Sequence, residues 1–252
     1  YRPDGTRNYL TDSTNPSFLN YKGRIGIELR GSSSQALDKK PYGFTTLLDD
    51  DDSNNNVSLL GMPSENDWVL NSLAYDPSMI RDYLSYTLAG NTGNYAPRVT
   101  YIEVIVNGDY KGVYFLTEKV KRDSDRVNLK KIADDDNDFP EVTGGYIIKA
   151  DKTTGGDEVA WTMPNYGGWD TNFLHHYPKT EDITSAQANY IETIFYNLAD
   201  QTNPANTSII DGYPSMIDIP SFVDYILMSE FASNPDAYQF STYFHKDRGG
   251  KL

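Results

Sequence analysis

The clearest structural signal in this sequence is a β-hairpin over residues 100–120. The segment TYIEVIVNGDYKGVYFLTEKV has two runs rich in β-branched and aromatic residues, and Asn107-Gly108 lies between them. A two-residue hairpin turn of this kind needs positive φ at both central residues, which Asn and Gly adopt more readily than most residues. Residues 100–120 are therefore predicted to form two antiparallel strands.

The segments before the hairpin are predicted to form two strands and a helix. Residues 24–31, RIGIELRG, alternate as a strand does and end in a Gly-Ser turn, and residues 39–48 form the strand that returns. Residues 77–89 carry apolar side chains at helical spacing, and Pro77 suits the first turn of a helix. The predicted order is strand, turn, strand, helix and hairpin.

Strand and loop segments follow the hairpin. Residues 144–152 are predicted to form a strand, and residues 243–246 another. The stretch between 153 and 182 is rich in Gly, Pro and aromatic residues, which predicts a loop. The turn DRGG near the end of the chain is expected to leave Arg248 exposed.

Two helices are expected in the last third of the chain. They cover about residues 185–199 and 221–231, with Thr184 and Ser221 as N-caps. Together with the strands they predict an α+β fold, strand-rich to about residue 150 and helical from about residue 151 to residue 252.

Composition excludes several classes of protein. The 252 residues carry a net charge of −14, which argues against a nucleic acid as the main partner. No apolar run is long enough for a transmembrane helix. The sequence has no Cys, and hence no disulfide, thiolate nucleophile or Cys-bound zinc. It also lacks GxSxG, HExxH, Walker A and GxGxxG motifs, which argues against a hydrolase of those types.

The segment ELRGSSSQALDKK has the residues of a phosphate-binding turn. Ser32 and Ser33 offer hydroxyls and backbone N–H groups, and Arg30 and Lys40 bracket the turn. Open backbone donors, a forked guanidinium and a compact ammonium together suit an anion. The alternative is a Ser-rich surface loop with two solvated cations, and the spacing alone leaves it open.

The end of the predicted hairpin is a second candidate. Glu118 and Lys119 follow an apolar strand at the point where the chain leaves the first sheet. A crossover of this kind is a natural place for a ligand cleft between two lobes. The alternative is an ordinary strand end with two neighbouring charges.

Asp236 is the third candidate, in the turn sequence SNPDAYQ. A carboxylate in such a turn, with Gln239, Ser241 and Thr242 close behind it, could accept a proton from a hydroxyl. The alternative is an Asp that only stabilises the turn, which is a common role for this residue.

Three further patterns are interpreted as ordinary structure. The acidic run at 134–138 alternates like a calcium loop but lacks the required Gly and Glu. His175 and His176 could bind a metal ion, but adjacent side chains diverge on a strand. An aromatic cluster has the residues of a stacking platform for a sugar or a peptide, and we expect it to pack locally: Trp161, Tyr166 and Trp169.

Five segments of the sequence, in this order, resemble the CotH kinase family, named for spore coat protein H. The resemblance runs from about Asn20 to the end of the chain. The segments are IGIELRGSSSQALDKKPYGF, LLGMPSENDWVL, YAPRVTYIEVIVNGDYKGVYFLTEKVKRDSDRVNL, GGYIIKADK and SFVDYILMSEFASNPDAYQFSTYFHKD.

The resemblance implies a single atypical protein-kinase-like domain with two lobes, ATP as the phosphate donor and Mg²⁺ as its helper. The small lobe and crossover would cover about residues 1–150, and residues 151–252 would form part of a helical large lobe. Relatives carry a metal-binding Asp in a Trp-Asp-x-Asp element, which we expect shortly after Leu252. The large lobe of the given chain is therefore expected to be truncated.

The resemblance also implies roles for individual residues. Asp236 matches the catalytic Asp of the family, and Arg30 and Lys40 match residues that we place at the nucleotide phosphates together with Ser32 and Ser33. Glu118 matches a position with a supporting or adenine-side role.

Two further residues carry over with less defined roles. Lys149 matches a position in the GGYIIK segment and is assigned to the nucleotide. Ser241 stands five residues after Asp236, where ordinary kinases have an Asn metal ligand. A hydroxyl is a weaker ligand for Mg²⁺, so the main ligand is expected beyond Leu252.

The function implied by the resemblance is transfer of phosphate from ATP to Ser or Thr of a surface or secreted protein. Two alternatives stay open, a surface adhesion module and a nucleotide-binding pseudokinase without transferase activity. Similar sequences occur in bacteria, and the acidic, Cys-free composition fits an extracytoplasmic protein. Without the expected second Asp, residues 1–252 alone should bind nucleotide weakly and transfer negligible phosphate.

Overall fold

The computed structural model describes residues 2, 4–50, 52–153, 157–164, 168–202 and 205–252. Helices and antiparallel sheets are mixed along the chain, so the predicted α+β class is confirmed. The chain forms two compact units. The first comprises Tyr1–Tyr83 and Arg98–Lys119, and the second Leu84–Pro97 and Val120–Leu252.

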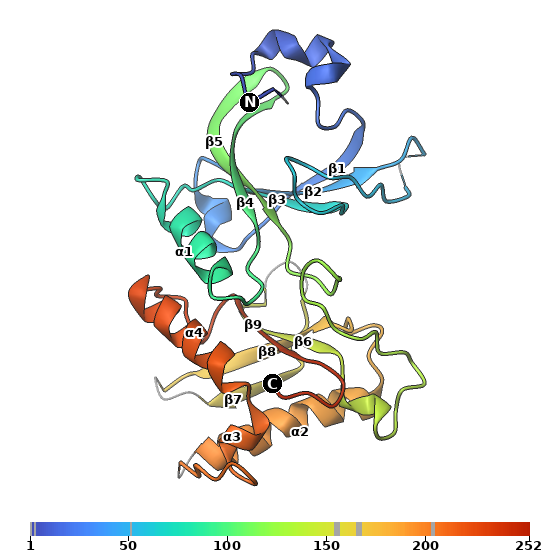
Figure 1. Ribbon diagram of the computed structural model, residues 1–252, viewed down its shortest axis with the longest axis vertical. Coiled ribbons are helices and arrows are strands. Elements are labelled where there is room, and N and C mark those ends of the chain that lie inside the picture. Colours follow the sequence, from blue (N-terminus) through green and yellow to red (C-terminus); the bar gives the residue numbers. More distant parts are fainter. Residues whose placement is uncertain (1, 3, 51, 154–156, 165–167, 203–204) are drawn as a thin grey trace. The chain divides into compact units, whose positions relative to one another are not determined.

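A five-stranded antiparallel sheet forms the first unit, with the strand order β1-β2-β3-β5-β4 (Figure 1). The hairpin prediction is confirmed, because β4 and β5 pair around Asn107 and Gly108, which both have positive φ. The third strand was not predicted. The strands are β1 (Arg24–Leu29), β2 (Tyr42–Leu47), β3 (Asp67–Asn71), β4 (Val99–Val106) and β5 (Asp109–Glu118).

Each face of the first sheet packs against a different layer. One face buries an apolar cluster that includes Trp68 and Tyr114. Helix α1 (Arg81–Gly90) begins over the other face, where Tyr83 stacks on Tyr101 of β4 with ring centroids 5.0 Å apart. The prediction that this helix packs on the sheet of the hairpin is confirmed at its first turn.

Helix α1 begins four residues later than Pro77, because Asp76 caps its first turn. The Asp76 carboxylate accepts hydrogen bonds from the backbone N–H groups of Ile80 and Arg81, at 3.0 and 2.9 Å. These are donors that have no partner inside the helix. The cap therefore sets the start of the helix.

The second unit is built on a four-stranded antiparallel sheet with the order β7-β8-β6-β9 (Figure 1). The prediction of a loop between residues 153 and 182 is wrong, because two of these strands lie there. β8 pairs with β6 and buries alternate residues such as Thr171 and Phe173, a tertiary pairing that the Gly-rich composition hid. The strands are β6 (Tyr146–Ala150), β7 (Trp161–Pro164), β8 (Asp170–Tyr177) and β9 (Thr242–Lys246).

Helices cover one face of this second sheet. Ile191 and Phe195 of α2 pack on Tyr146, Ile148 and Phe173 in the largest apolar cluster of the molecule's described part. The helices are α2 (Ser185–Thr202), α3 (Tyr213–Met216) and α4 (Ile219–Phe231). Short 3-10 helices are η1 (Leu10–Thr14), η2 (Pro16–Phe18), η3 (Ser33–Ala36) and η4 (Glu141–Thr143).

The helix caps confirm one prediction and correct another. Thr184 Oγ1 accepts a hydrogen bond from the Gln187 N–H at 3.3 Å, as expected of an N-cap. Asp218, and not Ser221, caps α4, since its carboxylate accepts the Ser221 N–H at 3.0 Å. Within the described residues, no helix is long and apolar enough to cross a membrane.

Candidate functional site

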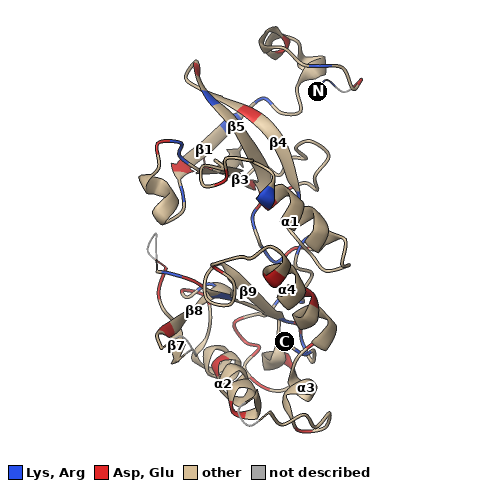
Figure 2. Cartoon of the chain, turned by 90° about the vertical axis from the view of Figure 1, so that its left-hand side faces the viewer, with Lys and Arg blue, Asp and Glu red and all other residues tan. Residues whose placement is uncertain are grey.

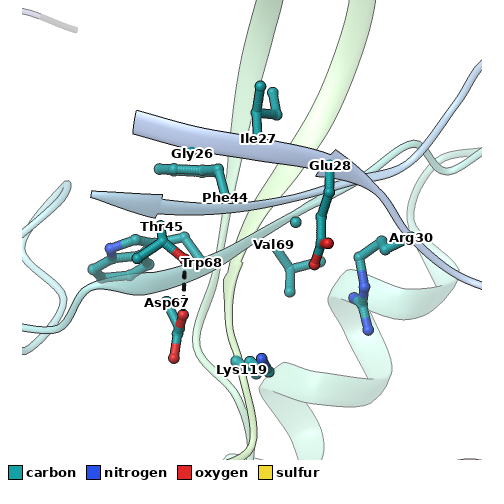
Figure 3. Close-up of a pocket in the computed structure, with 11 residues that line it drawn as sticks. Gly26, Ile27, Glu28, Arg30, Phe44, Thr45, Asp67, Trp68, Val69 and Lys119 are labelled. Carbon is teal, nitrogen blue, oxygen red and sulfur yellow. Dashed lines mark hydrogen bonds between the residues drawn. The ribbon is translucent and has the colours of Figure 1, made fainter. Parts of the chain in front are cut away.

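A hollow of about 370 Å³ lies on the first sheet. Its walls come from β1, β2 and β3, and from Lys119 just after β5. Figure 3 shows Glu28 reaching into it from β1, Arg30 from the residue just after β1, and Asp67 from β3. The remaining lining residues are Gly26, Ile27, Gly43, Phe44, Thr45, Trp68 and Val69.

Strand alternation places the charges of the first strand over this pocket. Glu28 and Arg30 are two residues apart, so their side chains leave the same face of the sheet. Gly43 of β2 pairs with Glu28, and a Cβ at Gly43 would lie 3.6 Å from Glu28 Oε1 and 4.0 Å from Arg30 Cδ. Both side chains thus pass beside a position that has no side chain, and Gly43 keeps this part of the pocket open.

Two cations and two carboxylates share the pocket. Arg30 and Lys119 bring positive charge, Glu28 and Asp67 negative charge, and Thr45 Oγ1 donates to Asp67 Oδ1 at 3.0 Å. Of these charges, the sequence analysis assigned Arg30 to a ligand and named Lys119, beside Glu118, at a second candidate site. The alternation of RIGIELR could have added Glu28, whereas Asp67 belongs to the strand that was not predicted.

The Gly-Ser turn between β1 and β2 holds the other predicted phosphate ligands. Ser32 and Ser33 are exposed there, and Lys40 Nζ donates to the Gln35 carbonyl at 2.7 Å. Lys40 therefore braces the turn, and its place at a phosphate stays a prediction. The neighbouring Lys39 lies over the Tyr114 ring, and burial lowers the pKa of its ammonium.

Glu118 is a buried structural carboxylate in this structure. Its side chain is inaccessible, and it accepts hydrogen bonds at 2.8 Å from the backbone N–H and from Nη1 of Arg98. This pairing joins the beginning of β4 to the end of β5. It fits the supporting role better than direct contact with a base, and Lys119 is the residue of this pair that lines the pocket.

Asp236 lies in the second unit, in the loop between α4 and β9. It is exposed, its backbone N–H donates to Asn234 Oδ1 at 3.1 Å, and its carbonyl accepts the Phe240 N–H at 2.9 Å. Within the described part of the chain, no hydrogen-bond partner occupies its carboxylate. The carboxylate is therefore presented to solvent by a turn whose backbone is fixed.

The loop from Asp236 to Ser241 is anchored at several points. The Tyr225 hydroxyl of α4 accepts the Tyr238 N–H at 2.9 Å, and Trp169 Nε1 donates to Gln239 Oε1 at 3.0 Å. Tyr238 and Ser241 both have positive φ, at 72° and 49°. Such strained backbone persists only where the surroundings determine it strongly, which is common at functional sites.

Lys149 and Ser241 both contact the carboxylate of Asp151. Lys149 Nζ lies 2.9 Å from Asp151 Oδ2, and Ser241 Oγ donates to the same oxygen at 3.4 Å. Burial alone would lower the pKa of Lys149, but Tyr243, Asp151 and Asp157 outweigh it and raise the pKa. Sequence reasoning missed Asp151, although its position directly after β6 and opposite Ser241 could have indicated it.

The comparison with protein families identifies the chain. A family model described as CotH kinase protein matches residues 27–252, which include Arg30, Lys149 and Asp236. The chain belongs to the CotH kinase family. A search of curated proteins finds no match. Family membership confirms the resemblance seen in the sequence and supports a kinase-like function at the level of the family.

Among the described residues of this CotH kinase chain, no group of three or more His, Asp or Glu could hold a metal ion. Asp236 is a single carboxylate, Ser241 is a neutral hydroxyl, and Asp151 is already paired with Lys149. Mg²⁺ in kinases is normally held by carboxylates together with phosphates and water.

The predicted residues of the CotH kinase site fall into both units. Arg30, Lys40 and Glu118 belong to the first unit, and Lys149 and Asp236 to the second. A cleft in which Arg30 faces Asp236 stays a prediction.

The weaker patterns have structural roles in this CotH kinase chain. Asp136 of the acidic run accepts a hydrogen bond from Arg248 Nη2 at 2.7 Å. The prediction that Arg248 is exposed is wrong, because its side chain is only 23% exposed and also donates to the Gly144 and Lys131 carbonyls. The acidic run thus pairs with a cation of the protein itself.

The two adjacent histidines have different neighbours, and the two described tryptophans of the predicted aromatic cluster differ in burial. One ring nitrogen of His176 is 2.8 Å from the Val120 carbonyl, whereas His175 lies beside Trp161. Trp161 is buried and stacks on Phe173, and Trp169 is 64% exposed. Tyr166 lies outside the described residues.

Proposed function

We propose that this chain is the ATP-binding part of a protein kinase with a two-lobed kinase-like fold, which transfers phosphate to Ser or Thr hydroxyls of a protein. The observation that carries the proposal is the pocket on β1, β2 and β3, lined by Arg30 and Lys119, in a chain that belongs to a kinase family. The first unit would be the small lobe and the second unit part of the large lobe.

The pocket has donors and acceptors for a nucleotide. Arg30 offers a forked set of N–H donors, and Lys119 a compact charge, both suited to phosphate oxygens. Glu28 and Asp67 can accept hydrogen bonds from ribose hydroxyls or from an exocyclic amine. The open position at Gly43 leaves room for the ligand beside the backbone.

Asp236 would orient the hydroxyl that receives the phosphate. In phosphoryl transfer the protein mostly positions groups and stabilises charge, and a carboxylate that accepts the proton of the nucleophile is a recurring part. Asp236 is exposed on an anchored loop, as a residue that meets a protein substrate must be. Mg²⁺, when bound, would neutralise phosphate charge.

The acceptor is proposed to be a surface or secreted protein. This part of the proposal rests only on the acidic, Cys-free composition and on the resemblance stated above. The adhesion alternative loses support from its proposed platform, because Trp161 is buried in the core. A pseudokinase would use the same pocket and would differ only in the absence of transfer.

The test has a binding arm and a transfer arm. In the binding arm, ATP should raise the melting temperature of residues 1–252, because a ligand of the folded state stabilises it by mass action. In the transfer arm, radiolabelled ATP is incubated with a Ser- and Thr-containing protein mixture and either residues 1–252 or a longer natural form of the protein.

The two arms separate the functions. Transfer by either form supports the kinase, and binding without transfer by both forms supports the pseudokinase. If ATP, ADP and inorganic phosphate all leave the melting temperature unchanged, the nucleotide pocket is refuted and the adhesion module becomes the better description.

A further inference from the structure

The register of the second sheet brings Asp151 beside the loop that carries Asp236. Strands β6 and β9 are antiparallel, and Ala150 at the end of β6 pairs with Thr242 at the start of β9. Asp151 follows Ala150, and Ser241 precedes Thr242. The same register therefore sets Asp151 and Ser241 opposite each other.

The Asp151 carboxylate is held on two sides. Its Oδ2 receives Ser241 Oγ at 3.4 Å and Lys149 Nζ at 2.9 Å, and its Oδ1 accepts the Lys152 N–H at 2.8 Å. The side chain is only 17% exposed. A carboxylate can accept several donors at once, so Asp151 connects β6 to the loop without giving up its ion pair.

The hydrogen bond to Asp151 affects the backbone conformation of Ser241. Its φ of 49° lies in the left-handed region, which a Ser adopts only at a cost. The hydrogen bond from its hydroxyl to Asp151 helps to hold that conformation. Tyr225 and Trp169 fasten the middle of the same loop, and Asp151 fastens the end that enters β9.

We propose that Asp151 is a positioning residue of this kinase. By holding Ser241 it sets the path of the loop and so the place at which Asp236 presents its carboxylate. Lys149 fixes Asp151 from the other side. The inference rests on the proposed function, because it names a residue that supports the same transfer step.

The chain offers a matched control for Asp151. Asp157 Oδ2 lies 3.6 Å from the same Lys149 Nζ, and its side chain is 50% exposed. Within the described residues, Asp157 has no hydrogen bond or ion pair to the 236–241 loop. Removing Asp157 therefore tests the loss of an ion pair to Lys149 without the loss of the loop contact.

The first measurement is phosphate transfer by whichever form of the protein is active. Asp151→Ala and Ser241→Ala should each lower kcat by about 10- to 100-fold, as expected for a small displacement of a catalytic group, with the KM for ATP within about twofold. Asp157→Ala should leave kcat within about twofold. The Asp151→Ala, Ser241→Ala double variant should be no slower than the slower single variant, because both changes remove one contact.

A conservative variant separates position from charge. Asp151→Asn keeps a side-chain oxygen that can accept the Ser241 hydroxyl but loses the charge that pairs with Lys149. If Asp151 acts by position, Asn should restore most of the kcat lost in Asp151→Ala. A kcat for Asn as low as for Ala, or multiplied losses in the double variant, would overturn the proposal.

The second measurement does not require activity. Trp169 Nε1 is bonded to Gln239 in this loop, so the indole N–H resonance of Trp169 reports the position of the loop. It should shift in Asp151→Ala and Ser241→Ala, and stay in place in Asp157→Ala. The resonances of the buried Trp68 and Trp161 should stay in place in all three, which shows that the units remain folded.

The two measurements distinguish a failure of the proposed kinase function from a failure of the inference about Asp151. If the wild-type protein transfers no phosphate, the proposed function fails, and the Trp169 resonance alone decides whether Asp151 holds the loop. An unchanged Trp169 resonance in Asp151→Ala overturns the inference in either case. A shifted resonance with unchanged kcat in an active protein overturns it as well, because the loop would then move without consequence for Asp236.

Discussion

The two sheets of this protein use their charged side chains in different ways. In the first unit, Glu28, Arg30 and Lys119 point into a pocket, and within the described residues no carboxylate pairs with Arg30. In the second unit, Lys149 pairs with Asp151, and Arg248 with Asp136 at 2.7 Å. Acidic and basic positions are spread over both units (Figure 2), and the first unit has a buried pair of its own, Arg98 with Glu118. The difference is therefore one between the residues of the pocket and the paired side chains of the second sheet.

This difference indicates that the pocket residues bind a ligand, whereas the paired charges position the backbone around them. A charge that is left open in a pocket keeps its capacity for a ligand, whereas a charge that is satisfied inside the protein fixes the backbone around it. Changes at the pocket residues of the first unit should therefore alter nucleotide affinity. Changes at the paired charges of the second sheet should alter the transfer rate or the stability of the fold.

The largest effect is expected at Asp236. Asp236→Asn should lower the rate of phosphate transfer by about 10²- to 10⁴-fold, the range for loss of a general base, and leave nucleotide affinity unchanged. Its side chain is exposed and unpaired within the described residues, so the melting temperature should stay the same. Rates from radiolabelled ATP check this prediction. Asp211→Asn, another exposed carboxylate of the second unit, should have the wild-type rate.

The next effect is expected in the pocket of the first unit. Arg30→Glu should weaken nucleotide binding by at least about tenfold, since it removes charge-assisted hydrogen bonds and adds repulsion toward phosphate. Titration calorimetry with ATP measures the change. Lys22→Glu changes charge by the same amount at an exposed position outside the pocket, and equal losses in both variants would show that the pocket does not bind phosphate.

The difference between the units also explains what the sequence could predict. Local patterns were sufficient for the Asn107-Gly108 hairpin, for α2 and for the strand RIGIEL, because turn chemistry and periodicity are local. They were not sufficient for β3 or for the strands between residues 153 and 182, which exist through pairing with distant segments. Family resemblance supplied Asp236, whose sequence alone is that of an ordinary turn.

The candidate site was predicted less completely than the fold. Arg30 was found because a cation beside a Gly-Ser turn is a local signal. Asp67 and Asp151 were missed because each becomes relevant through strand register, Asp67 beside Thr45 and Asp151 beside Ser241. At Lys40 the ammonium donates to the Gln35 carbonyl within the turn, and its place at a phosphate stays a prediction.

A smaller effect is expected at the paired charges of the second unit. Arg248→Ala should lower the free energy of unfolding by about 1–2 kcal/mol, because the half-buried Asp136 and two carbonyls lose their donor. Arg81→Ala is the control in the first unit, where the side chain is 78% exposed and its ion pair to Asp76 is 3.7 Å long, and it should change stability by less than about 0.5 kcal/mol. Urea denaturation compares the two. If both variants lowered the free energy of unfolding equally, the short and half-buried pair of Arg248 would stabilise the fold no more than the long and exposed pair of Arg81.

The smallest effect is a dependence of the first unit on acid, at the cap of α1. Hydrogen bonds from the Ser78 side chain and from the backbone N–H of Arg81 lower the pKa of Asp76 from 3.8 to about 2. A carboxyl group whose pKa is lower in the folded state stabilises the fold fully above its unfolded pKa, and loses that contribution as pH falls through the folded pKa.

Asp76→Asn should therefore lower the melting temperature by a constant amount from pH 7 to about pH 4, and the difference from the wild type should shrink as pH falls toward about 2. Amide exchange at Ile80 and Arg81, the two donors to this carboxylate, should follow the same dependence. Asp211→Asn, an exposed carboxylate of the second unit, should show no such difference at any pH. If the difference at Asp76 instead persists at pH 2, or grows there, the cap does not act through its charge.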